Sequence, residues 1–226
     1  MDRASLPLPV PPVDTDHAGL MDRQYRYQRH IYDLTRKYYL FGRDRLLDGL
    51  DVKPGEKVLE VGCGTGRNIG HMMDRYPGAW FFGLDISREM LDTAEKRFAR
   101  RGGARPRLAV ADATAFTAGD FGEAGFNRVV VSYALSMIPA WQEAIERAFD
   151  ALAPGGSLHI VDFGQQERLP TPIHRLLQGW LTRFHVTPRP DLFEVLQAAA
   201  HRRGAHVAAE TPYGGYAWLA IAKMPD

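Results

Sequence analysis

The chain of 226 residues has a single cysteine and no long apolar run. Cys63 cannot form a disulfide within the chain, and no charged leader followed by an apolar stretch opens the sequence, so we expect a cytoplasmic protein. No window approaches the roughly 18 apolar residues that a membrane span requires. Contact with lipid is therefore expected only at the surface of a membrane. For a cytoplasmic protein this is the inner face of the cytoplasmic membrane.

An excess of charge of one sign is also lacking. Lys and Arg number 28 against 27 Asp and Glu, which leaves a formal net charge of +1. Such a chain has no overall field that would recruit nucleic acid, although a local patch can still matter. The eight histidines show no spacing typical of metal ligands, so no metal site is predicted. The length and the 45% hydrophobic content suit one globular α/β domain.

Composition divides the chain into three segments. Residues 1–20 hold four prolines within six positions and no periodic pattern, which predicts a flexible arm. Residues 21–52 have a helical and basic pattern, for which we expect a helical lid. Residues 53–226 form the main domain, in which apolar strands alternate with helices. The predicted strands are 57–61, 80–84, 107–111, 128–132 and 157–163, and the predicted helices are 68–76, 87–101 and 141–153.

Apolar strands that alternate with helices predict a mostly parallel sheet covered on both faces. Ligands of such a sheet bind beyond the carboxyl ends of its strands. The tail of the chain differs, because "HVAAE" and "AWLAIAK" read as two strands joined by the glycine turn "TPYGGY". We therefore predict an antiparallel edge at the C-terminus.

The stretch "VLEVGCGTG" at residues 58–66 places three glycines within five positions, directly after an apolar strand. Glycines at such a turn let backbone N–H groups approach a ligand closely, because no Cβ stands in the way. Dinucleotide-binding folds use the same device, so the glycines alone do not identify the ligand. The acid Glu60 would repel pyrophosphate but suits a ligand that carries an ammonium and a sulfonium group.

This stretch resembles the first motif of class I S-adenosylmethionine-dependent methyltransferases, and the likeness runs from about residue 53 to 223. It implies a Rossmann-like, doubly wound sheet of seven strands, mostly parallel with an antiparallel C-terminal edge strand, and S-adenosyl-L-methionine as cofactor. Asp85 would take the two ribose hydroxyls, and Asp112 with the N–H of Ala113 would contact adenine. The predicted cofactor-binding residues are Tyr25, Tyr32, Arg36, Glu60, Gly62, Gly64, Gly66, Asp85, Ile86, Asp112, Ala113 and Ser132.

The segment 22–45 combines seven Arg or Lys with three Asp and five Tyr. Tyr25, Tyr32 and Tyr39 repeat every seven residues and so share one helical face. One interpretation is a helix that covers the sheet, with half-buried tyrosines and solvated cations. Another is a lid that offers hydroxyl and guanidinium groups to a carboxylate, and the two are compatible.

This segment, with "GRN" after the glycine loop and "SYALSMIP" at residues 132–139, resembles bacterial betaine-lipid N-methyltransferases. That resemblance implies threefold methylation of the amine of diacylglyceryl homoserine, a lipid substrate whose carboxylate needs a cation and whose cationic product suits aromatic faces. The predicted catalytic residues are Tyr133 and Tyr32. The predicted substrate-binding residues are Arg26, Arg29, Tyr39, Trp141, Tyr213 and Tyr216.

An amphipathic insertion is predicted at residues 165–190. Its apolar residues between 173 and 184 fall on one helical face, and the other face carries His174, Arg175, Gln178 and Arg183 but no acid. This pattern is typical of a helix that lies in a membrane interface and also of one that faces a core. Both interpretations stay open on the sequence.

Three rival functions share these patterns. A methyltransferase for a quinone-like or other small apolar acceptor has the same fold and an aromatic pocket. A nucleic-acid methyltransferase is disfavoured, because the fourth strand ends in "SYALSMIP" instead of an Asn-Pro-Pro-aromatic tetrad. A protein that binds the cofactor without turnover is the third. The sequence does not predict the oligomeric state.

Overall fold

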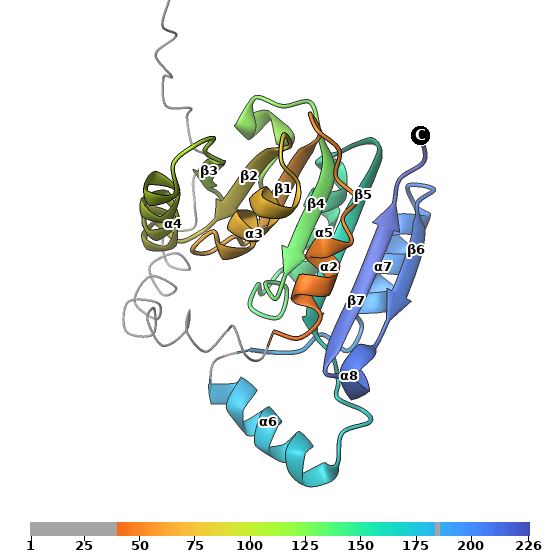
Figure 1. The fold of residues 1–226 in the computed structure, drawn as a ribbon. Helices are drawn as coiled ribbons and strands as arrows, with labels where there is room; N and C mark the ends of the chain where they lie inside the picture. Colours follow the sequence, from red (N-terminus) through yellow and green to blue (C-terminus); the bar gives the residue numbers. More distant parts are fainter. Residues whose placement is uncertain (1–39, 184–185) are drawn as a thin grey trace, which may run out of the picture.

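The computed structural model describes residues 40–183 and 186–226, with a seven-stranded sheet at their centre (Figure 1). The predicted arm and most of the predicted helical lid, residues 1–39, lie outside the described residues. The strands are β1 (Lys57–Val61), β2 (Trp80–Asp85), β3 (Arg107–Val110), β4 (Phe126–Ser132), β5 (Leu152–Phe163), β6 (His206–Glu210) and β7 (Ala217–Lys223).

The strand order in the sheet is β3-β2-β1-β4-β5-β7-β6. Strands β1 to β5 pair in parallel, whereas β7 runs antiparallel to both β5 and β6. The mostly parallel sheet with an antiparallel C-terminal strand is therefore confirmed, with β7 inserted between β5 and the edge strand β6. The order reverses between β1 and β4, and a crevice for ligands is expected at the carboxyl ends of these strands.

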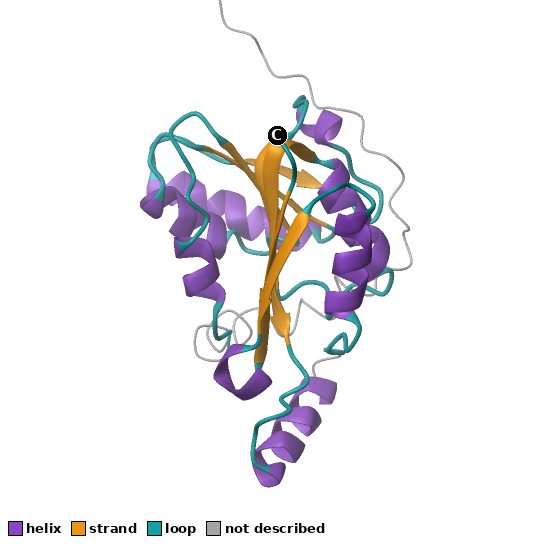
Figure 2. Cartoon of the chain, turned by 90° about the vertical axis from the view of Figure 1, so that its right-hand side faces the viewer, coloured by secondary structure: helices purple, strands orange, loops and turns teal. Residues whose placement is uncertain are grey.

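Helices cover both faces of the sheet, as the edge-on view in Figure 2 shows. Helices α2, α3 and α4 pack on one apolar cluster, and α5 and α7 pack on the other. The helices are α2 (Arg43–Asp48), α3 (Arg67–Arg75), α4 (Arg88–Arg101), the 3-10 turn η1 (Ala118–Phe121), α5 (Trp141–Asp150), α6 (Thr171–Arg183), α7 (Leu192–His201) and α8 (Pro212–Gly215).

Helix α5 illustrates how the apolar pattern sets the packing. Its buried residues, Trp141, Ala144, Ile145, Ala148 and Phe149, recur at steps of three and four. The helix ends at Asp150, earlier than predicted, because the following Pro-Gly-Gly run lies within β5 and not before it. Pairing of that strand with β4 begins opposite its first residue and shifts register once along the way.

Helix α6 falls within the predicted insertion and lies beyond the end of the sheet toward which β4 points (Figure 1). Leu181 is fully buried, and Leu177 packs partly buried against the cluster on the α2, α3 and α4 face. Part of the apolar stripe therefore faces the core, as one of the two interpretations predicted. Among the described helices, none has the length and apolar character needed to cross a membrane.

The core holds one buried histidine that makes stability depend on pH. His159 on β5 is 3% exposed, and its Nε2 lies 2.8 Å from the hydroxyl oxygen of Ser157. Burial, with a smaller contribution from the nearby cation Arg128, lowers the pKa of His159 from 6.5 to about 3. Below pH 6.5 the unfolded chain therefore binds a proton that the folded chain does not, so stability falls as the pH drops from 6.5 toward 3.

We expect this group alone to cost about 1.3 kcal/mol of unfolding free energy between pH 7 and pH 5.5. Urea unfolding at the two pH values measures the loss of unfolding free energy. The loss in His159→Gln should be smaller than that in the unchanged protein by about 1.3 kcal/mol. The exposed His201 provides the matched control, because His201→Gln should leave the loss unchanged. Equal losses in all three proteins would contradict the assignment.

Candidate active site

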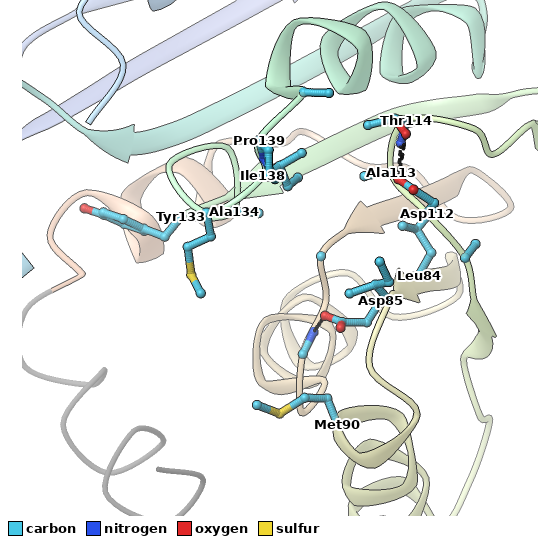
Figure 3. A pocket seen from close by; sticks show the side chains of 16 residues that line it. Leu84, Asp85, Met90, Asp112, Ala113, Thr114, Tyr133, Ala134, Ile138 and Pro139 are labelled. Carbon is cyan, nitrogen blue, oxygen red and sulfur yellow. Dashed lines mark hydrogen bonds between the residues drawn. The ribbon is translucent and has the colours of Figure 1, made fainter. Parts of the chain in front are cut away.

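A cavity of about 340 Å³ opens at the carboxyl ends of β1 to β4 (Figure 3). The walls come from the glycine loop after β1, the ends of β2 and β3, and the loop at residues 133–140 after β4. The parallel register of these strands brings their ends together although they are distant in sequence. The predicted site residues that line the cavity are Gly62, Gly64, Asp85, Ile86, Asp112, Ala113 and Tyr133.

Gly62 and Gly66 of the glycine loop lie too close to their neighbours for a side chain. Gly62, Gly64 and Gly66 have φ of 70°, 53° and 70°, a left-handed conformation that L side chains rarely adopt. A Cβ on Gly62 would lie 2.8 Å from the Cβ of Ala134 in the opposite wall. Gly62 and Gly64 thus line the cavity with backbone atoms.

Asp85 joins the glycine loop to the end of β2. Its Oδ2 accepts a hydrogen bond from the N–H of Gly64 at 2.8 Å (Figure 3). Its Oδ1 accepts one from the N–H of Ser87 at 2.9 Å. Ser87 itself caps α4, because its side chain accepts from Met90. A carboxylate has about four lone-pair sites, which suits it to accept from a pair of neighbouring hydroxyls as well.

Asp112 occupies the corresponding place after β3. Its Oδ1 accepts hydrogen bonds from the N–H and the hydroxyl of Thr114, at 2.8 and 2.7 Å (Figure 3). These bonds fix the turn in which Ala113 faces the same cavity. The two carboxylates therefore lie at successive strand ends along one wall, as the ribose and adenine assignments require.

A smaller polar hollow adjoins the loop and shares Gly62 with the main cavity. Arg43 lines it with a side chain only 6% exposed, ion-paired to Asp44 at 2.7 Å. Ser132 also lines it, and its hydroxyl has no hydrogen-bond partner within the described part of the chain. Arg43 was not among the predicted site residues, since its only signal was membership of the basic segment 22–45.

Glu60 is buried beneath the glycine loop. It is 1% exposed, and its Oε1 accepts a hydrogen bond of 2.6 Å from Asn68 on α3. The carboxylates of Asp85 and Asp112 match the ribose and adenine parts of S-adenosyl-L-methionine. The glycine loop, with the buried guanidinium and the hydroxyl of the polar hollow, matches its amino-acid part. These residues fit the implied cofactor.

Tyr133 begins the loop after β4 and is 1% exposed, with a positive φ of 53°. Its hydroxyl donates a hydrogen bond of 2.6 Å to the carbonyl of Phe41. Burial, with smaller contributions from neighbours that include the carboxylate of Asp162, raises the pKa of Tyr133 well above 10. The phenol therefore stays protonated at neutral pH and fastens the chain at Phe41, an arrangement that suits positioning better than proton acceptance.

The predicted substrate residues are dispersed. Trp141 lies in the core at 3% exposure and is not part of the cavity wall. Tyr216 packs between Phe163 and Phe41, with ring centroids 5.8 and 5.1 Å away. Tyr213 is 49% exposed, and its ring centroid lies 5.5 Å from that of Phe41. The remaining predicted residues lie outside the described residues: Tyr25, Arg26, Arg29, Tyr32, Arg36 and Tyr39.

An aromatic row thus runs from the cavity to the surface. It consists of Tyr133, Phe163, Tyr216, Phe41 and Tyr213, each ring adjacent to the next. The sequence predicted three of its members but not the two phenylalanines, whose contacts depend on the fold. Among the described residues, no group of His, Cys, Asp or Glu can hold a metal ion.

Comparison with known proteins gives one family match and several relatives. The model of a methyltransferase domain matches residues 58–156. A demethylmenaquinone methyltransferase of Beutenbergia cavernae is 29% identical over 199 residues, which cover 80% of this chain and 74% of the relative. A ubiquinone/menaquinone biosynthesis C-methyltransferase of Paracoccus denitrificans is 29% identical over 191 residues, covering 81% and 72%.

Solved structures share the fold at lower identity. A chain of the Haloferax volcanii complex between the Trm112 methyltransferase activator and a putative methyltransferase has a TM-score of 0.69 at 16% identity, covering 91% of this chain and 97% of that one. The phosphoethanolamine N-methyltransferase 2 of Haemonchus contortus, in complex with S-adenosyl-L-methionine, has a TM-score of 0.64 at 17% identity, covering 82% and 53%.

Proposed function

We propose that this chain, which is an S-adenosylmethionine-dependent methyltransferase with the class I fold, methylates a lipophilic acceptor that carries a polar reactive group. The observation that carries the proposal is the likeness to quinone methyltransferases over about four fifths of the chain. An acceptor of this kind comes from a membrane, so peripheral contact through the insertion at 165–190 is part of the proposal.

The bound cofactor supplies an electrophilic methyl group on a sulfonium. The chain's own contribution is orientation and exclusion of water. Asp85 and Asp112 hold two parts of the cofactor along one wall, and the glycine loop supports the third. Met137, Ile138 and Pro139 give the opposite wall an apolar surface that keeps water from the reacting groups.

A quinone-like ring is the acceptor that the comparisons favour. The relatives from B. cavernae and P. denitrificans are named for methylation in menaquinone and ubiquinone biosynthesis. The aromatic row supports a planar ring, because offset and edge-to-face contacts between rings are favourable. Tyr213 and Phe41 at its exposed end, 49% and 47% accessible, are where such an acceptor would first be met.

The amine of diacylglyceryl homoserine is a second candidate. A sequence feature favours it: the basic, tyrosine-rich segment 22–45 with "GRN" and "SYALSMIP", which resembles betaine-lipid N-methyltransferases. The same aromatic row would suit the quaternary ammonium product through cation–π contacts. Threefold methylation of the amine is therefore the main alternative outcome of the test.

The experiment is mass spectrometry of lipids from a bacterium that makes both demethylmenaquinone and diacylglyceryl homoserine, with and without this protein. One added methyl group on the quinone supports the first acceptor, and three on the homoserine lipid support the second. Asp85→Ala is the control, since this variant loses the acceptor for the ribose hydroxyls and a gain that persists in it does not come from this site. No gain on either lipid, with the protein folded and binding cofactor, would refute both assignments.

A further inference from the structure

One wall of the cavity is a loop held from behind by distant segments. Residues 133–140, the wall loop, turn back on themselves through hydrogen bonds from the N–H groups of Met137 and Ile138 to the carbonyl of Ala134. The loop belongs to no helix or strand beyond this turn, although it forms much of the cavity lining. Its conformation must therefore be fixed by outside contacts.

Those contacts come from the segment 186–190, the α6 linker, which joins α6 to α7. The guanidinium of Arg189 donates to the carbonyl of Leu135 at 3.1 Å through Nε and to that of Ile138 at 2.7 Å through Nη2. Thr187 donates its backbone N–H to the carbonyl of Ser136 at 3.0 Å. Three carbonyls of the wall loop thus have their partners in this one linker.

The sheet holds the same loop from the other side. Asp162 on β5 is 1% exposed, and its Oδ2 accepts a hydrogen bond of 3.1 Å from the N–H of Ser136. The guanidinium of Arg189 also lies 5.8 Å from the ring centroid of Trp141, at the start of α5. The wall loop is thereby held between a buried carboxylate and a stacked guanidinium.

We infer that Arg189 is a positioning residue for methyl transfer, which fixes the wall loop over the cofactor cavity and couples that loop to α6. Only a guanidinium presents planar donors that reach two carbonyls three residues apart while stacking on an indole. Arg189 does not line the cavity itself, so its effect on the ligand passes through the wall loop, in which Ile138 is both a partner of Arg189 and a lining residue.

The coupling to α6 follows from the linker's short path. Val186 donates its N–H to the carbonyl of Leu181 at 3.1 Å, and Leu181 on α6 is fully buried. A shift in the position of α6 is therefore transmitted to Arg189 over a few residues of the chain. This inference rests on the cofactor cavity and holds whichever acceptor is methylated.

The test measures binding of S-adenosylhomocysteine by calorimetry, well below the melting temperature of each variant. Arg189→Gln is expected to raise the Kd about tenfold, the effect of about one net hydrogen bond, and Arg189→Lys less. The control is Arg203→Gln, because the guanidinium of Arg203 also lies over an α5 ring, 5.2 Å from the centroid of Phe149, but pairs with Glu146 and Asp150 of α5 and not with carbonyls of the wall loop.

Arg203→Gln should lower the melting temperature slightly and leave the Kd within about twofold, since Arg203 pairs with two acids of α5 and does not line the cavity. An unchanged Kd in Arg189→Gln, or an equal rise in Arg203→Gln, would overturn the positioning role. If Arg189→Gln does not fold, Arg189→Lys decides the question by the same comparison.

A double-mutant cycle tests the coupling. Leu181→Ala should raise the Kd. The fold-increase in Kd of the double variant Leu181→Ala/Arg189→Gln should be smaller than the product of the fold-increases of the two single variants. A multiplicative result would overturn the coupling to α6. Because the probe is the cofactor product and not an acceptor, failure here and failure of the proposed function are distinguishable.

Discussion

Asp85→Ala is expected to raise the Kd for S-adenosyl-L-methionine by at least about 100-fold, since each charge-assisted hydrogen bond contributes roughly 1.5–3 kcal/mol. The variant loses the acceptor for the ribose hydroxyls. It also frees the N–H groups of Gly64 and Ser87, which the carboxylate holds at 2.8 and 2.9 Å. Calorimetric titration with the cofactor measures the loss.

Two further variants separate these contributions. Asp85→Asn keeps one acceptor oxygen and the side-chain volume, so its Kd should lie between those of the unchanged protein and Asp85→Ala. Asp74→Ala removes an exposed carboxylate paired with Arg101 and should leave the Kd unchanged. Unchanged affinity in Asp85→Ala would show that the cofactor does not bind where the motif places it.

Asp85 and Asp112 were predictable because strand ends are local features of the sequence. Each acid directly follows an apolar run, and parallel strands bring such ends to one edge of the sheet. The glycine loop was predictable for the same reason, since its conformation is set by the residues within it. Pattern and fold therefore agree where the site is built from consecutive residues.

Residues that reach the site through tertiary contacts were not predictable. Arg43 enters the polar hollow only because α2 packs beside α3 and β5, and its burial has no signature in the surrounding sequence. Arg189 supports the wall loop across 54 residues of chain. An arginine that donates to backbone carbonyls leaves no motif, because any residue type can supply the carbonyl.

Trp141 shows how one residue can satisfy two patterns. Its aromatic character suggested a contact with substrate, whereas its place on the apolar face of α5 suits burial in the core. The structure places it in the core, at 3% exposure. Helical periodicity involves five residues and aromatic identity only one, so the periodic pattern was the stronger evidence.

Gly66→Ala is expected to lower the unfolding free energy by about 3 kcal/mol, the sum of two effects. The left-handed backbone, with φ of 70°, costs a Cβ-bearing residue roughly 1–2 kcal/mol. A Cβ there would also lie 2.6 Å from Cε2 of Phe98 and 3.1 Å from the Cβ of Ala94, and such overpacking costs about 1–3 kcal/mol. Urea unfolding monitored by circular dichroism measures the sum.

Gly122→Ala isolates the backbone effect. Gly122 has nearly the same left-handed backbone, with φ of 71° and ψ of 25° against 70° and 20° at Gly66, but no atom lies within 4 Å of where its Cβ would be, so only the loss of roughly 1–2 kcal/mol is expected. Phe98→Leu in the Gly66→Ala background should recover part of the difference, because a smaller side chain leaves room for the new methyl group. Equal destabilisation by the two glycine substitutions would mean that Phe98 and Ala94 do not confine the loop, and that backbone conformation alone requires glycine at position 66.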